Sequence, residues 1–404
     1  MASIPDPSSE PFRFGQLIYD RRYRSMTIQV FAFIMIMAFL WQLGWNTVQN
    51  LSALGKDFDF GFLGSRAGYD INQRLIEYSN DSTHGRAAII GILNTLLVAF
   101  LGCILATIIG VIAGVLRLSK NWIVARLMTV YVEGFRNIPL LLWILVIFAV
   151  MTEATPQPRD FREGGDASMM LFDSVAITNR GIFIPSPIWG EGSNLLMAVF
   201  VASLFAIWAF RRYARKKQEA TGQILPVFWI SITLFFVPTV TFYFILGGPI
   251  TLQLPELGGF NFTGGLQVRN SLIALWFALS LYTGAFIAEI VRSGILAVSR
   301  GQTEAAYALG LRPNRTMNLV ILPQALRVII PPLISQYLNL TKNSSLAIAV
   351  GYMDVRSTLG GITINQTGRE LEGMLLLGVF YLVTSLIISG VMNVYNNAVK
   401  LKER

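Results

Sequence analysis

Long runs of apolar residues recur along the whole chain and constrain its fold more than any other feature. A helix rises about 1.5 Å per residue, so about 20 apolar residues cross the roughly 30 Å of a bilayer's hydrocarbon. Hydrophobic residues make up 53% of the 404 residues and charged ones 14%, few for a soluble protein. We therefore predict an all-α membrane protein with eight transmembrane helices, at 27–45, 88–116, 122–151, 195–210, 224–246, 271–292, 326–350 and 374–396.

Basic residues are distributed unevenly between the two sides that these spans define. The loops on the side of the termini hold most arginines and lysines, whereas acidic residues predominate on the opposite side. Because basic residues concentrate in cytoplasmic loops, we predict that both termini are cytoplasmic. The net charge of +9 then follows from membrane orientation, and no nucleic-acid partner is expected. The long loops 47–86 and 152–194 would lie outside, as irregular segments rich in Gly, Pro, Asp and Asn.

The sequence offers little for catalysis. Cys103 is expected in the second span and His84 in a loop, so we predict no disulfide, no metal site and no catalytic residues. The chain lacks a G-x-x-x-x-G-K-[ST] phosphate loop, since the nearest string, at 54–57, has neither the first glycine nor the hydroxyl. We therefore expect a transport subunit or a scaffold, with no ATP hydrolysis on this chain.

The segment 299–325, between the sixth and seventh spans, has the pattern of a helix that ends at a glycine. Thr303 can cap the start of this helix. Glu304 would then lie in the first turn, where an acidic side chain suits the helix dipole. Gly310 can end the helix, and the alanines before it would let another protein approach closely.

A second short helix is expected after Gly310. Pro313 suits its first turn, the helix would cover 314–322, and Pro323 would open the next span. The resulting elbow resembles the EAA loop of ABC-importer permeases, which in that family docks on the ATPase subunit. The matching residues are Glu304, Ala305, Ala306, Gly310, Ile321, Leu322 and Pro323.

Further motifs extend this resemblance over roughly 88–151 and 271–396. They are Asn94-Thr95-Leu96, Pro139-Leu140-Leu141, the stretch 288–294 and the stretch 342–346. They look like those of polar amino-acid permeases of the histidine, glutamine and arginine uptake type. The type I ABC-importer core has five spans in that family. Three extra spans are similar to the enlarged permeases of general L-amino-acid and glutamate/glutamine/aspartate/asparagine uptake systems.

The resemblance implies a division of the chain into six parts. A cytoplasmic N-terminal segment would be followed by an extra span with its outer loop, a first core part, an insertion with two extra spans, a second core part and a cytoplasmic tail. Their ranges are 1–26, 27–87, 88–151, 152–270, 271–396 and 397–404.

The same resemblance implies a permease that moves L-amino acids across the bacterial inner membrane into the cytoplasm. A separate ABC ATPase would bind ATP and Mg²⁺, and no cofactor is expected on this chain. A periplasmic or extracellular binding protein, a second permease and membrane lipid would be the other partners. The second permease is expected to be a different chain, with a second copy as the alternative. An ion-coupled secondary transporter and a non-transporting scaffold are rival functions.

Polar residues inside the predicted spans are candidates for a substrate pathway, because ionisable groups in a bilayer usually face a cavity or a partner. Glu133 and Arg136 can pair on one helix face, either as a neutralised pair beside Pro139 or as a contact for substrate. Glu289 and Arg292 have the same spacing and are expected to form a local ion pair. The candidates in the seventh span are Asn339, Lys342, Asn343, Ser344 and Ser345.

Overall fold

The computed structural model describes residues 21–53, 55 and 58–399, in two compact units, Met1–Ser65 and Arg66–Arg404. The described part of the first unit contains helix α2 (Arg21–Ala53) and the 3-10 helix η1 (Gly61–Gly64). The expected first span therefore lies within α2, whose most apolar window is exposed throughout. Most of the expected segment 1–26 and of the tail 397–404 lies outside the described residues.

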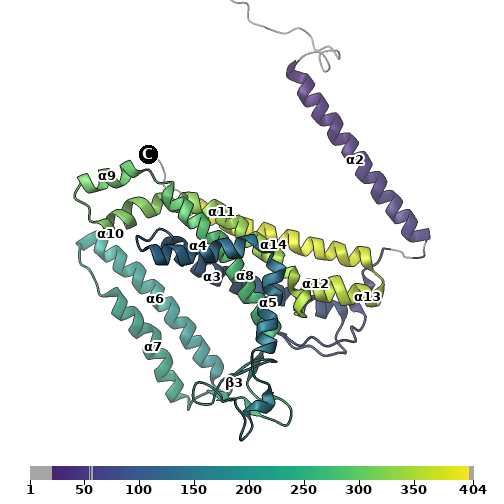
Figure 1. Cartoon of the computed structure of the whole chain (residues 1–404), viewed down its shortest axis with the longest axis horizontal. Coiled ribbons are helices and arrows are strands. Elements are labelled where there is room, and N and C mark those ends of the chain that lie inside the picture. The colour runs from purple at the N-terminus through teal and green to yellow at the C-terminus, as the bar shows by residue number, and fades with distance from the viewer. Residues whose placement is uncertain (1–20, 54, 56–57, 400–404) are drawn as a thin grey trace, which may run out of the picture. The chain divides into compact units, whose positions relative to one another are not determined.

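The second unit is built from long apolar helices (Figure 1). In the described chain, α2 included, seven helices are long and apolar enough to cross a membrane, or eight if the bent pair α4–α5 counts as one span. This confirms the predicted fold class. The helices of the second unit are α3 (His84–Leu116), α4 (Trp122–Asn137), α5 (Leu140–Glu153), α6 (Ser193–Thr221), α7 (Val227–Ile245), α8 (Asn270–Leu296), α11 (Leu322–Asn343) and α14 (Glu370–Val399).

Shorter helices connect α8 to α11 and α11 to α14. Those before α11 are α9 (Arg300–Ala308), α10 (Pro313–Thr316) and the π-helical turn η3 (Met317–Ile321). Those after α11 are η4 (Ser344–Val350), α12 (Val355–Ser357), η5 (Thr358–Thr363) and α13 (Ile364–Thr367).

The expected span 122–151 is broken rather than gently kinked. Helices α4 and α5 meet at an angle of 109°. Ile138 lies between them in an extended conformation, as residues before proline commonly do. Pro139 follows and has no N–H to continue the ladder of α4. The bend therefore has a local cause that is visible in the sequence, although its size is not.

Helices α3 and α8 pack with their backbones unusually close. A Cβ added at Gly110 would lie 2.5 Å from the Cβ of Ile287 and 2.9 Å from the carbonyl oxygen of Gly284. A Cβ added at Gly114 would lie 2.6 Å from the carbonyl oxygen of Ala288. Small residues at this spacing are typical of helix packing in membranes, where close van der Waals contact replaces the hydrophobic effect.

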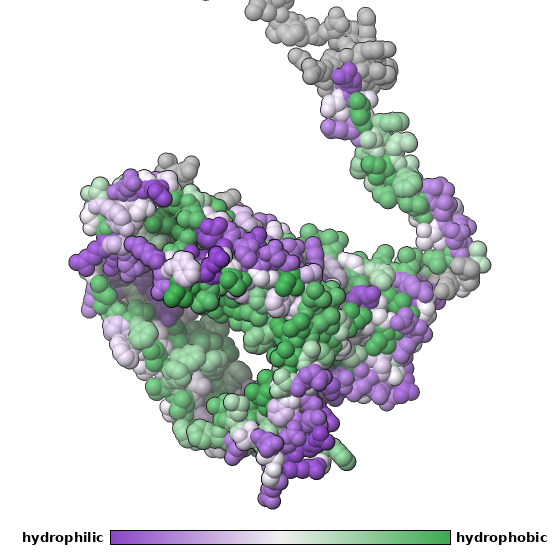
Figure 2. Space-filling model, in the orientation of Figure 1, coloured by the Kyte–Doolittle hydropathy of each residue, from purple (hydrophilic) through white to green (hydrophobic). Residues whose placement is uncertain are grey.

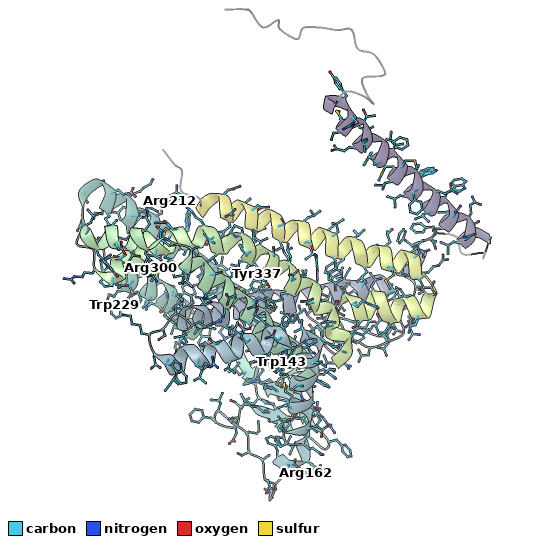
Figure 3. The ribbon with its side chains drawn as sticks, turned by 45° about the horizontal axis from the view of Figure 1, so that its top comes forward. Trp143, Arg162, Arg212, Trp229, Arg300 and Tyr337 are labelled. Carbon is cyan, nitrogen blue, oxygen red and sulfur yellow. The ribbon has the colours of Figure 1, made fainter. Side chains whose placement is uncertain are left out.

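Hydrogen bonds fasten two more helices to this pair. The Tyr131 hydroxyl on α4 donates to the carbonyl oxygen of Leu281 on α8 at 2.7 Å. On α11, the Tyr337 hydroxyl lies 2.7 Å from Oγ1 of Thr107 on α3 (Figure 3). Buried leucine, isoleucine and valine side chains of α3, α5, α8 and α11 fill the core between these contacts.

The insertion between α5 and α8 has two parts. Helices α6 and α7 form a hairpin in which Phe200 packs edge-on against Phe235, with ring centroids 5.6 Å apart. The segments that connect the hairpin to α5 and α8 form small antiparallel sheets. Their strands are β1 (Ala176–Thr178), β2 (Gly181–Ile184) and β7 (Leu266–Val268), then β3 (Ser186–Trp189) with β4 (Ile250–Gln253), then β5 (Glu256–Leu257) with β6 (Phe262–Thr263).

The expectation of a wholly irregular loop over 152–194 was therefore wrong. Ile182 of β2 pairs with Val268 of β7, and the whole α6–α7 hairpin lies between these two residues in the sequence. Strands this short gain their stability from such distant partners, which no local pattern reveals.

We predict that Gly110→Ala and Gly114→Ala each destabilise the protein by about 1–3 kcal/mol, because a buried methyl would push α3 away from α8. The check is the thermal unfolding midpoint in mild detergent. Gly390→Ala on α14 is the matched control, since nothing lies within 4 Å of a Cβ there and alanine favours a helix. Equal losses of stability in all three variants would contradict this account.

Candidate functional site

The first arm of the elbow is α9, which starts earlier than expected. It begins at Arg300, with Ser299 in the N-cap position and no side-chain cap. Thr303 and Glu304 therefore do not cap or open the helix, and that expectation was wrong. The backbone N–H of Gln302 bonds instead to the carbonyl of Ser299 at 3.1 Å, so the helix starts without help from Thr303.

Gly310 ends α9 as expected. Its φ of +75° lies in the left-handed region, which glycine adopts without strain. The Gly310 N–H bonds to the carbonyl of Tyr307 at 2.9 Å, and the Leu311 N–H bonds to that of Ala306 at 3.1 Å. This pair of bonds is the Schellman motif, which satisfies the last carbonyls of a helix and fixes the direction of the chain beyond it.

The second arm is continuous with the seventh span. Helix α10 begins at Pro313 as expected, but no separate helix over 314–322 exists, because Pro313–Val350 forms one helical run of 38 residues. The N–H of Leu322 bonds to the carbonyl of Met317 and closes the π turn η3. This wider turn precedes Pro323, whose missing N–H would otherwise break the ladder.

The two arms pack together and leave one side of the elbow open. Ala306 is buried, whereas Glu304 and Ala305 are exposed, and Leu309 is 81% exposed. Ile321, Leu322 and Pro323 lie where the π turn joins α11. The structure thus brings the seven EAA-like residues to one compact feature with an apolar, exposed tip.

Glu133 and Arg136 belong to a larger charge network. Glu133 lies 3.9 Å from Arg136 and 3.7 Å from Arg117 at the end of α3. The Arg117 guanidinium, which is 10% exposed, also donates to Glu289 of α8 at 2.5 Å. Glu289 pairs with Arg292 at 2.6 Å, as the sequence predicted. These ion pairs tie α3, α4 and α8 together at one end.

Lys342 lines a crevice of about 430 Å³ between the end of α11 and α14. Ser345 lines it too, whereas Ser344 is buried and donates to the carbonyl of Thr341 at 2.7 Å. Asn339 is exposed and Asn343 is half-buried. Only Lys342 and Ser345 of the five candidates are therefore among the residues that line this crevice.

Two hydroxyl residues of α14, Tyr381 and Ser385, also line the crevice, together with Leu382. They were not among the residues predicted from the sequence. They lie four residues apart, so they share one face of a helix. A tyrosine and a serine at this spacing inside an apolar span are the signal that could have identified them. The Tyr381 hydroxyl is buried beside Ser344 and Ser345 at the end of α11.

His84 does not lie in a loop, as was expected, but is the first residue of α3. Thr83 caps this helix by accepting a bond from the Arg86 N–H at 3.2 Å. The His84 ring is buried, and its Nδ1 lies 3.0 Å from Oγ1 of Thr363. His84 therefore joins α3 to the segment before α14.

The motif residues Asn94 and Thr95 also join distant segments. The Asn94 amide donates to the carbonyls of Gln73 at 2.8 Å and Met353 at 2.9 Å. Thr95 accepts a bond from the Val355 N–H at 3.1 Å. This motif thus fixes both the loop before α3 and the segment after α11.

The family model described as a binding-protein-dependent transport system inner membrane component matches residues 220–401. The chain is 57% identical, over 100% of both chains, to the glutamate/glutamine/aspartate/asparagine transport system permease BztB of Rhodobacter capsulatus. It is 46% identical to the general L-amino acid transport system permease AapQ of Rhizobium johnstonii, over 97% of this chain and 96% of the relative.

A third relative, a putative amino-acid ABC transporter permease of Escherichia coli, is 42% identical over 94% of this chain and 95% of its own. Among solved structures, a crystal structure of an amino acid ABC transporter with histidines has 18% identity and a TM-score of 0.45, covering 78% of this chain and 95% of that one.

These full-length relatives define the class: an integral membrane permease of a binding-protein-dependent transporter. The chain belongs to the ABC-transporter permease family, in the branch of the polar amino-acid permeases. It is therefore a multi-pass transport component of the inner membrane rather than an enzyme, and the resemblance to ABC-importer permeases is confirmed.

Asp354, before α12, should make stability depend on pH. Burial raises the pKa of its carboxyl from 3.8 to about 6, against the opposing hydrogen bonds from Ser357. The native state then binds the proton more tightly than the unfolded chain. This contribution to stability is complete below the unfolded pKa and is lost as the pH rises through about 6.

We predict that Asp354→Asn, which keeps the acceptor oxygen but cannot titrate, removes this dependence. The difference in stability between the variant and the parent should change by up to about 3 kcal/mol between about pH 7 and about pH 4. Thermal midpoints in detergent at several pH values check this. A difference that stays constant over this range would contradict it.

Proposed function

We propose that this chain imports L-amino acids as the permease subunit of an ATP-driven importer. Its full-length identity to permeases named for acidic amino acids, their amides and L-amino acids in general carries this proposal. A binding protein would deliver the amino acid on the side that the charge distribution assigns to the outside. A separate ATPase would drive the cycle and would hold ATP and Mg²⁺.

The ATPase would dock on the elbow formed by Glu304, Ala305, Ala306, Gly310, Ile321, Leu322 and Pro323. Support comes from its open side, where Leu309 protrudes, and from the hydrogen bonds that fix its turn at Gly310. Because the second arm runs into α11 without a break, a push on the elbow would move the seventh span directly. Coupling would therefore need no flexible link.

The substrate pathway would run past Lys342. Its ammonium group suits the carboxylate of an amino acid, and the hydroxyls of Ser345, Tyr381 and Ser385 can bind either end of a zwitterion. Asn339, Asn343 and Ser344 would support this path from the same stretch of chain. Glu133 and Arg136 are the more distant candidates, since both already take part in ion pairs.

A second permease would face the exposed side of α11. Asn339 and Lys342 are exposed on this helix, and polar groups of this kind are costly against lipid. A partner subunit or a water-filled space between two permeases would remove that cost. We propose a heterodimer, with a second copy of this chain as the alternative that the subunit composition of the purified complex distinguishes.

We predict that Glu304→Lys and Gly310→Val each reduce the amount of ATPase that co-purifies with the chain by about tenfold or more. A side chain at Gly310 would strain its left-handed backbone by about 1–2 kcal/mol, and a lysine would replace the negative charge at position 304 with a positive one. Purification in mild detergent from native membranes, followed by identification of bound proteins, measures this.

The matched control is Gly259→Ala, in the turn between β5 and β6, where a Cβ meets no atom within 4 Å. If the parent chain brings down no ATPase, the importer proposal fails, and a secondary transporter or a scaffold takes its place. If all the variants retain the ATPase, the elbow is not its docking site.

We predict that Lys342→Met raises the KM for uptake by about tenfold or more, since a charged hydrogen bond contributes about 1.5–3 kcal/mol. Tyr381→Phe should have a smaller effect, and Lys342→Arg should restore part of the loss. Uptake by vesicles that contain the whole transporter measures this, with Lys120→Met, a change at an exposed lysine, as the control. An unchanged KM in Lys342→Met would place the pathway elsewhere.

A further inference from the structure

The end of α6 carries a dense basic cluster. Its five residues lie within two turns, and the nearest acidic residue on the helix is Glu219. Successive residues of a helix are rotated by about 100°, so four of the five share one side. All four are exposed. The cluster consists of Arg211, Arg212, Arg215, Lys216 and Lys217, of which Lys217 alone points to another side.

The cluster lies beyond the apolar part of the hairpin. Helix α7 has 19 residues, which is about 28 Å and close to the thickness of the hydrocarbon. Helix α6 has 29 residues, about 43 Å, so its last three turns extend past the start of α7. Hydrophobic side chains cover the middle of the hairpin, and hydrophilic ones gather at the end where α6 stops (Figure 2).

Exposed indoles adjoin the cluster. Trp208, one turn before Arg212, is 61% exposed, and Trp229 near the start of α7 is 68% exposed. The Arg212 guanidinium lies 5.6 Å from the centroid of the Trp208 ring. Figure 3 shows Arg212 and Trp229 on the same side of the second unit. Tryptophan is enriched at the level of lipid headgroups, so the basic cluster begins at that level.

Among the described residues, Arg215 alone of the cluster has an acidic partner. Arg211 is 3.4 Å from the hydroxyl of Ser231 on α7, and Arg215 pairs with Glu219 at 3.1 Å. No described acidic residue forms an ion pair with Arg212 or Lys216. Membrane orientation explains the sign of these charges. It does not explain their placement on one side of a helix, next to exposed indoles.

We propose that the basic end of α6 binds the phosphate headgroups of anionic phospholipids. Arg212, Arg215 and Lys216 would contact the phosphates, while Trp208 and Trp229 would lie among the glycerol and upper acyl groups. Juxtamembrane basic clusters attract anionic lipid by about 1 kcal/mol for each residue. A soluble protein partner would cover the charges but would leave the indoles, which lie nearer the hydrocarbon, uncovered. The geometry therefore favours lipid over the ATPase as the occupant.

The experiment uses the full chain in nanodiscs of phosphatidylcholine with a small fraction of photoactivatable phosphatidylglycerol. Crosslinked peptides are mapped by mass spectrometry, and photoactivatable phosphatidylcholine replaces the anionic probe in a parallel sample. We expect the peptide that contains 208–217 to be labelled strongly by the anionic probe and weakly by the neutral one. Equal labelling of this peptide in the unaltered chain would overturn the proposal, whatever the variants do.

The triple variant Arg212→Gln, Arg215→Gln, Lys216→Gln should weaken the preference for phosphatidylglycerol at this peptide by roughly a hundredfold. The matched control, Arg24→Gln, Lys120→Gln, Arg126→Gln, removes the same charge from other exposed positions and should keep this preference. Retained labelling in the α6 variant would overturn the proposal.

Two further measurements distinguish lipid from other anions and partners. Excess inorganic phosphate should not displace the probe, and displacement would assign the site to a free anion. If the α6 variant loses bound ATPase but keeps its lipid labelling, the cluster is a protein-binding surface and the proposal is wrong. Trp208→Leu leaves every charge in place, so it should reduce the labelling of this peptide only moderately. Unchanged labelling in Trp208→Leu would show that the indole is not part of the lipid site.

Discussion

The close contact between α3 and α8 is the constraint on which the second unit depends. Lipid tails do not drive apolar helices together, so helices in a bilayer associate where small residues let their backbones approach. Gly110 and Gly114 provide this approach. The other core helices are then fastened to the pair by single polar contacts, such as Tyr131 with Leu281 and Thr107 with Tyr337. A change of spacing between α3 and α8 would disturb all of them together.

The basic residues at one end of the helices serve two different purposes. Arg117 is almost buried between Glu133 and Glu289, and its ion pairs join α3, α4 and α8. Removal of either partner would leave a charge with less compensation in a poorly solvated place. Arg212 and Lys216 are exposed and lack acidic partners among the described residues, so their charges are available to anions outside the chain. The positive-inside rule counts these residues alike, although the structure separates them.

The sequence predicted the spans well because an apolar run of about 20 residues has few alternatives to crossing a membrane. Gly310 and Pro313 were predictable for local reasons of backbone conformation. The spacing of Tyr381 and Ser385 marks them as a polar pair, but their meeting with Lys342 was not predictable, because it arises only after α14 packs beside α11. The strands β2 and β7 were not predicted either, because each pairs with a partner that is distant in the sequence. The continuity of the helix through Pro323 depends on one π turn, whose local sequence gives no comparable signal.

That continuity also fixes a rotational phase. The helix is continuous from Pro313 to Lys342, and each residue turns it by about 100°. The angle between the direction in which Lys342 points and the direction in which α10 of the elbow points is therefore fixed. A single inserted or deleted residue in this stretch would preserve the hydropathy and the length of the span, yet it would turn one end against the other by more than a quarter of a circle. This stretch of helix can therefore accept substitutions that keep its hydropathy, but not the insertion or deletion of a residue.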